Sequence, residues 1–135
     1  MYSKNPYEQY KSNSITTAGP GEMVVLLFEG CWKFLKKAKE AIIEKDISGA
    51  NENLIKAQNI LTELMSTLDF KYQISKDLFD IYEFMYNELV QINIHKDAER
   101  LEPIIKLVYE YYETWKQAAK QARIENSKSS DGSYV

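Results

Sequence analysis

Helix-breaking residues are scarce in this sequence, which contains three prolines and five glycines among its 135 residues. Cys31 is the only cysteine, and a single thiol excludes an internal disulfide. The longest apolar run, Met23–Phe28, is far shorter than the roughly 20 residues that a membrane-spanning helix needs. The N-terminal stretch MYSKNPYEQY also lacks the apolar core of a signal peptide. These absences predict a cytoplasmic and largely helical protein.

Histidine is equally rare, since His95 is the only one. Di-iron carboxylate bundles need Glu-x-x-His pairs on facing helices, whereas the residue three positions before His95 is Ile92. His95 is also close to a helix end, which does not suit phosphotransfer from a mid-helix histidine. Gly19-Pro20-Gly21 lacks the Gly-Lys-Ser/Thr ending of a phosphate-binding loop. The net charge of −3 argues against nucleic acid as a partner. We therefore expect no enzyme, no metal site and no cofactor.

Apolar residues recur at spacings of three and four along four segments, which is the period of an amphipathic helix. Pro20 suits a first helical position, and we expect the first helix to extend from Pro20 to Glu44. Asp46 is a suitable N-cap for the second helix and Asp97 for the fourth. Pro103 lies beyond the first turn of the fourth helix and predicts a kink or a break there.

The fold expected from these segments is an all-α, antiparallel up-down four-helix bundle over residues 20–123. No stretch alternates strictly between apolar and polar residues, so strands are not expected. Residues 1–19 form an N-terminal arm in front of the bundle. Residues 124–135 are polar and rich in serine, which predicts a disordered C-terminal tail.

Aromatic residues are more numerous than one narrow helical seam can bury, with ten tyrosines, five phenylalanines and two tryptophans. The third and fourth helices each carry a second apolar line beside the core line, formed by Phe79, Tyr82, Tyr86, Ile104, Leu107 and Tyr111. These residues either widen the core face, as helices of globular proteins usually require, or serve binding. Binding would mean a groove that receives an amphipathic helix or an extended peptide, or a homodimer seam.

The N-terminal arm places a few apolar residues in a polar stretch, namely Tyr7, Tyr10 and Ile15. Such a segment is able to cover an apolar groove of the bundle until a partner displaces it. Met23, just inside the first helix, belongs to the same apolar excess. We predict these four residues and the two second lines as client-binding residues.

One stretch is specific enough to indicate a family. It reads Ala18-Gly19-Pro20-Gly21-Glu22-Met23, followed by Leu26-Leu27-Phe28-Glu29-Gly30. Together with Ala57-Gln58, Leu68-Asp69 and Asp97 further on, it resembles the FliS family of flagellar export chaperones, from about residue 7 to residue 115. Gly19 stands where that family usually has serine, Phe28 where it has tyrosine, and Glu29 where it has aspartate.

The resemblance implies a bacterial cytosolic bundle that binds the disordered, hydrophobic C-terminal segment of flagellin. It also implies that binding prevents premature polymerisation and assists delivery to the flagellar export apparatus, with no membrane insertion. It supports Tyr7, Tyr10 and Tyr82 as client contacts, whereas the other predicted residues follow from the apolar excess alone. The alternative from the residues themselves is a structural bundle that forms a permanent homodimer without a client.

Overall fold

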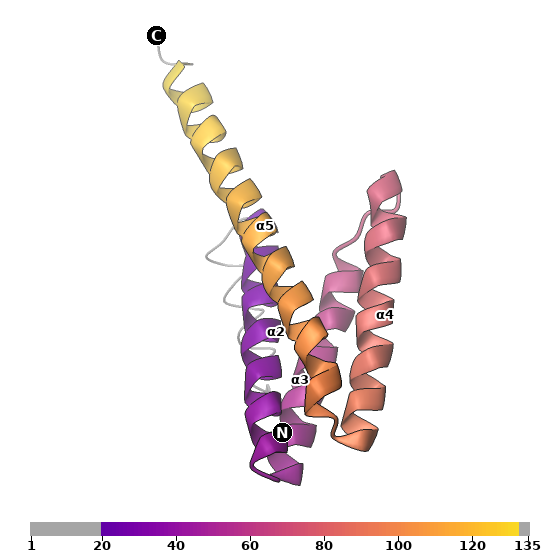
Figure 1. The fold of residues 1–135 in the computed structure, drawn as a ribbon. Coiled ribbons are helices and arrows are strands. Elements are labelled where there is room, and N and C mark those ends of the chain that lie inside the picture. The colour runs from indigo at the N-terminus through magenta and orange to yellow at the C-terminus, as the bar shows by residue number, and fades with distance from the viewer. Residues whose placement is uncertain (1–19, 133–135) are drawn as a thin grey trace, which may run out of the picture.

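The computed structural model describes residues 20–132, which form four helices and, within that range, no strand (Figure 1). The helices are α2 (Pro20–Ile43), α3 (Ile47–Ser66), α4 (Gln73–His95) and α5 (Ala98–Gly132). Short connections make each helix antiparallel to the next along the chain (Figure 1). The all-α up-down four-helix bundle expected from the apolar periodicity is confirmed.

The helix boundaries follow from local chemistry. The carboxylate of Asp46 accepts a hydrogen bond from the backbone N–H of Gly49 at 2.9 Å, which caps α3 as expected. The carboxylate of Asp97 does the same for α5, with the N–H of Arg100 at 3.1 Å. The chain leaves α2 and α4 through Lys45 and Lys96, whose φ values are 63° and 50°. Both turns therefore place a residue other than glycine in the left-handed backbone conformation, which is modestly unfavourable in conformational energy.

The helices pack unequally. α2 packs closely against both α3 and α5, and α3 packs against α4, whereas α4 and α5 contact each other least among the neighbouring pairs. α4 and α5 lie close together at their shared loop and separate toward the other end of the bundle (Figure 1). The bundle is therefore least tightly closed between α4 and α5.

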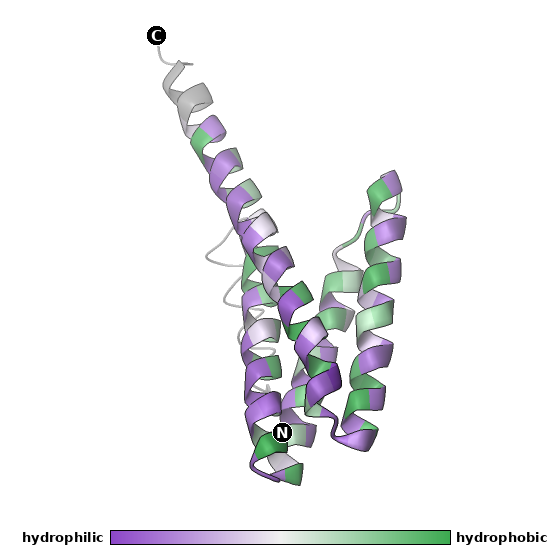
Figure 2. Ribbon diagram, in the orientation of Figure 1, coloured by the Kyte–Doolittle hydropathy of each residue, from purple (hydrophilic) through white to green (hydrophobic). Residues whose placement is uncertain are grey.

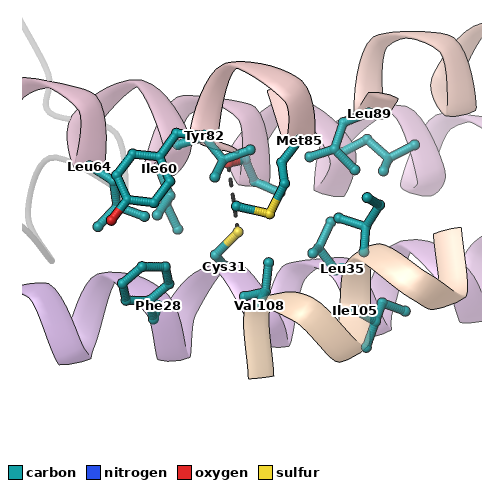
Figure 3. Packing of buried hydrophobic residues seen from close by; sticks show 14 of the residues in the cluster. Phe28, Cys31, Leu35, Ile60, Leu64, Tyr82, Met85, Leu89, Ile105 and Val108 are labelled. Atoms are coloured by element: carbon teal, nitrogen blue, oxygen red, sulfur yellow. Dashed lines mark hydrogen bonds between the residues drawn. The ribbon is translucent and has the colours of Figure 1, made fainter. Parts of the chain in front are cut away.

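A single apolar core fills the space between the helices (Figure 3). Its fully buried members come from all four helices and include Leu27, Leu35, Leu54, Leu61, Met85, Leu89, Leu101 and Val108. Cys31 is buried among them, with its Sγ 3.9 Å from the carbonyl oxygen of Ala57. Burial raises the pKa of the Cys31 thiol to about 12, so the side chain acts as a small apolar residue and not as a nucleophile.

α5 differs from the sequence prediction in two respects. It continues through Pro103 as one helix, so the break that was one of the two expectations for Pro103 does not occur. It also continues to Gly132, so residues 124–132, which the sequence assigned to a disordered tail, are helical. The side chains of residues 120–127 are exposed, and this end of α5 is mostly hydrophilic and extends beyond the other helices (Figures 1 and 2). A packed helix propagates into such a stretch because each further residue adds a backbone hydrogen bond without a new nucleation cost.

Candidate protein-binding site

The described residues offer apolar surface and no arrangement for metal chemistry. Among residues 20–132, no group of three or more His, Cys, Asp or Glu side chains is placed to hold a metal ion. Within the same range, no helix has both the length and the apolar character that crossing a membrane requires. The candidate site is therefore built from the aromatic and aliphatic side chains that the core leaves partly uncovered.

The structure places the predicted client-binding residues of the helices at two levels of exposure. Tyr82 and Ile104 are core residues, with 1% and 3% of their surface exposed. The remaining predicted residues on the helices are half-buried, namely Met23, Phe79, Tyr86, Leu107 and Tyr111. Tyr7, Tyr10 and Ile15 lie outside the described residues. A client contact at any of these positions stays a prediction, and for Tyr82 and Ile104 almost no surface is left for it.

An aromatic cluster joins α4 and α5 through α2. The ring of Phe28 lies 5.7 Å from the ring of Tyr111 and nearly parallel to it, with an interplanar angle of 14°. The same Phe28 ring lies 6.0 Å from the ring of Tyr82, and Figure 3 shows these two rings at one end of the buried cluster. The second lines of α4 and α5 therefore meet at Phe28. We call Phe28, Tyr82, Tyr86, Leu107 and Tyr111 the α4–α5 aromatic surface.

Two tyrosines of this surface, Tyr82 and Tyr111, have a raised pKa and remain protonated at neutral pH. Burial, and to a smaller extent the neighbouring Tyr111, raises the pKa of Tyr82 above its ordinary value. Burial also raises the pKa of Tyr111, with a further contribution from the nearby Glu110. The half-buried ring of Tyr111 therefore presents an apolar face and a neutral hydroxyl, a combination suited to a protein interface.

Phe79 departs from the predicted arrangement. Its ring packs edge-on against Phe70 of the α3–α4 connection, with 5.9 Å between the ring centroids. Phe70 itself is 60% exposed, and Tyr72 and Ile74 beside it are similarly uncovered. Phe79 therefore belongs to an apolar group at the end of the bundle, which the helical periodicity of α4 did not distinguish from the second line.

A second apolar surface lies on the other side of α5, where the sequence analysis placed no site. Trp32 of α2 lies 4.8 Å from Tyr109 and 6.3 Å from Tyr112, measured between ring centroids. The hydroxyl of Tyr112 donates a hydrogen bond to the carboxylate of Glu29 at 3.1 Å. The only available signal was the spacing of three between Tyr109 and Tyr112, which core packing would have explained equally well.

One ion pair holds α4 to α5 close to their loop. The guanidinium of Arg100 donates two hydrogen bonds to the carboxylate of Glu88, at 2.7 and 3.0 Å. This fork geometry is the strongest form of such a pair. The helices are thus fastened at the loop end, and the α4–α5 aromatic surface lies further along, toward the end where they separate (Figure 1).

We expect this pair to make stability depend on acid pH. The hydrogen bonds from Arg100 hold the pKa of Glu88 below its usual value. A depressed carboxyl pKa contributes stability above the usual glutamate pKa of about 4.3, and that contribution disappears as the pH falls through the lower folded-state value. Urea unfolding of the wild type and of Glu88→Gln should therefore show a difference at pH 7 that shrinks in the acid range below about pH 4.

The control for this prediction is Glu83→Gln. Glu83 is an exposed glutamate on the same helix, with no ion pair among the described residues. Its substitution should leave the pH profile of the unfolding free energy close to that of the wild type. Identical profiles for the two variants would show that the Arg100–Glu88 pair adds nothing to stability.

A small helical bundle with a partly uncovered aromatic surface presents apolar surface of the kind that marks a site for binding another protein. The chain belongs to the FliS family: the family model described as "Flagellar protein FliS" matches residues 3–122. The family is one of flagellar secretion chaperones and not of enzymes, and the resemblance noted in the sequence is confirmed.

The relatives agree along nearly the whole chain. "Flagellar secretion chaperone FliS" of Bacillus subtilis (strain 168) is 42% identical over 123 residues, which cover 91% of this chain and 92% of that protein. The protein of the same name from Salmonella typhimurium is 27% identical over 135 residues, covering 95% and 100% of the two chains. A crystal structure of a flagellar chaperone from bacteria matches with a TM-score of 0.70 at 18% identity, over 85% of this chain and 95% of that one, and supports the fold.

Proposed function

We propose that this chaperone binds the hydrophobic C-terminal segment of flagellin in the bacterial cytoplasm. Binding would prevent premature polymerisation and assist delivery of the client to the export apparatus. The observation that carries the proposal is the α4–α5 aromatic surface, where half-buried Tyr86, Leu107 and Tyr111 pack against the core that contains buried Phe28 and Tyr82. The family membership and the names of the relatives support a flagellar client.

The physics of a secretion chaperone favours such a surface. A disordered segment that folds on binding covers a large apolar area, yet it loses on the order of 2–5 kcal/mol or more to ordering. The complex is therefore specific without being irreversible, which suits a client that has to be released. Tyrosine is a favourable contact residue because it offers a large apolar face and a polar tip with few rotatable bonds.

We further propose that the N-terminal arm competes with the client for this surface. The arm joins α2 at Pro20, one turn before Met23 and about two turns before Phe28. Its apolar residues Tyr7, Tyr10 and Ile15 would cover the half-buried rings of α4 and α5 when no client is bound. Covering apolar surface in the free protein reduces non-specific association.

Deleting residues 1–17 tests the arm. We expect the helical circular dichroism signal of the bundle to persist, because all four core-forming helices begin at or after Pro20. Fluorescence of a dye that binds apolar surface should rise, and affinity for the client segment should increase because a competitor has been removed. Deletion of residues 128–135 at the other terminus is the control. Unchanged dye binding and client affinity after both deletions would argue against a covering arm.

The direct test of the function is calorimetric titration with the C-terminal segment of flagellin from the same organism. We expect a one-to-one complex, a strongly negative heat-capacity change from apolar burial, and a gain of helicity. No binding at tens of micromolar by a folded bundle would contradict the proposal. A mass that rises with concentration in the absence of any client would then favour the homodimer.

A further inference from the structure

We propose that the outer side of the α2–α5 pair is a second docking surface, which accepts an acidic amphipathic helix from a partner other than the client. Three hollows follow one another along this side, with volumes of about 270, 340 and 400 Å³. All of their lining residues belong to α2 and α5, and none to α3 or α4. We call this side the α2–α5 groove.

The dimensions of the α2–α5 groove match a helix. The α2 residues that line it extend from Glu22 to Ile43, roughly 30 Å at about 1.5 Å per residue. Because α2 and α5 are antiparallel, residues Arg123 to Glu102 of α5 line the opposite wall. A partner helix of about 20 residues would occupy this length.

The floor of the groove provides contacts of the kind that dominate protein interfaces. Its centre is the group formed by Trp32, Tyr109 and Tyr112, in which Tyr109 is 39% exposed. Val25, Leu26 and Ala119 line the first hollow, and Ile43, 63% exposed, lies at the other end. Tryptophan and tyrosine are enriched among the residues that contribute most to binding energy. The apolar ridge of an amphipathic helix would contact these residues in turn.

The charges at one end of the groove select the partner, since the other two hollows are lined by equal numbers of lysines and glutamates. The first hollow is lined by Lys116, Lys120 and Arg123 against a single acid, Glu22. Arg123 pairs with Glu22 at 3.0 Å, whereas Lys116 and Lys120 have no ion pair within the described part of the chain. The first turn of α2 adds positive partial charge at this end. This local excess of positive charge contrasts with the net charge of −3 of the whole protein, so the complementary partner carries carboxylates beside its apolar ridge.

The groove is separate from the α4–α5 aromatic surface. Tyr109 and Tyr111 are two residues apart, which places their side chains about 200° apart around α5. Tyr111 stacks on Phe28 on one side, and Tyr109 packs on Trp32 on the other. The body of α5 lies between the two surfaces, so a client and a partner helix are able to bind at the same time.

Two synthetic peptides test this proposal. Both are 18-residue amphipathic helices with the same leucine ridge, flanked by glutamate in one peptide and by lysine in the other. Both peptides are titrated into a Trp115→Phe variant, in which Trp32 is the only tryptophan left. A change in its fluorescence then reports occupancy of the groove. We expect the glutamate peptide to bind about tenfold more tightly or better, and the double variant K116E/K120E to abolish or reverse that preference.

The matched control is K37E/K45E, which makes the same charge change at exposed lysines that line none of the three hollows. This control variant should keep the preference for the glutamate peptide. Tyr109→Ala should weaken the binding of both peptides. An excess of the flagellin segment should leave peptide binding unchanged. Equal binding of the two peptides, or an effect of K37E/K45E as large as that of K116E/K120E, would overturn the proposal. Displacement by the flagellin segment would show that the groove belongs to the client.

Discussion

Tyr82→Ala is expected to lower the free energy of unfolding by about 3–5 kcal/mol, the range for removing a large aromatic side chain from a core. Tyr82 is 1% exposed, and its ring packs against Phe28 of α2. The truncation therefore removes apolar contacts between α4 and α2 and leaves a cavity that the neighbouring helices fill only in part. Urea unfolding followed by circular dichroism measures the loss as a lower midpoint with an unchanged slope.

Tyr72→Ala provides the comparison for that measurement. Tyr72 is 62% exposed and precedes the first turn of α4, without a side-chain capping hydrogen bond. Its removal should change the unfolding free energy by less than about 0.5 kcal/mol, as is usual for exposed positions. If Tyr82→Ala kept the wild-type midpoint and lost only client affinity, Tyr82 would be a contact residue, as the family resemblance implies.

Tyr111→Ala is expected to weaken binding of the flagellin segment by about 1–3 kcal/mol, or roughly 5-fold to 150-fold. Tyr111 is half-buried and stacks on Phe28, so its ring is held in place while part of it remains accessible. A preorganised aromatic ring loses little entropy on binding, which makes it an effective contact. Calorimetric titration at a temperature where the variant is fully folded measures the loss.

The matched control is Tyr109→Ala on the same helix. It removes the same type of side chain from the opposite side of α5, where Tyr109 faces Trp32. Client affinity should be nearly unchanged in this variant. If Tyr109→Ala lost client affinity and Tyr111→Ala kept it, the client site would lie in the α2–α5 groove and the α4–α5 aromatic surface would be structural.

Local features were predicted correctly because their causes are local. The caps at Asp46 and Asp97 depend on a carboxylate three residues before a backbone N–H, which the sequence shows directly. The beginning of α2 at Pro20 follows from a residue that needs no hydrogen-bond donor. The burial of Leu54, Leu61 and Leu64 follows from a repeat of three and four that keeps one face of α3 toward its neighbours.

Residues outside these core-facing repeats were harder to assign as buried or exposed. Tyr82 and Tyr86 occupy the same second line in the sequence, yet Tyr82 is buried and Tyr86 is half-buried. The difference depends on Phe28, which lies more than 50 positions away along the chain and covers Tyr82 from α2. The length of α5 was not evident from the sequence either, since a polar composition predicts little packing but does not prevent a helix from continuing.

The sequence by itself determined that the chain is helical, where three of its four helices begin, which face of each helix is apolar, and that the chain resembles flagellar export chaperones. The helical properties depend on neighbours within about one turn of helix, so the order of residues contains them. Only the tertiary structure decided which helices pack closely, that α4 and α5 separate beyond the Arg100–Glu88 pair, and that Trp32 meets Tyr109 across the α2–α5 groove. The physical reason is that an amphipathic pattern states how much apolar surface a helix must bury, but not which neighbour covers it.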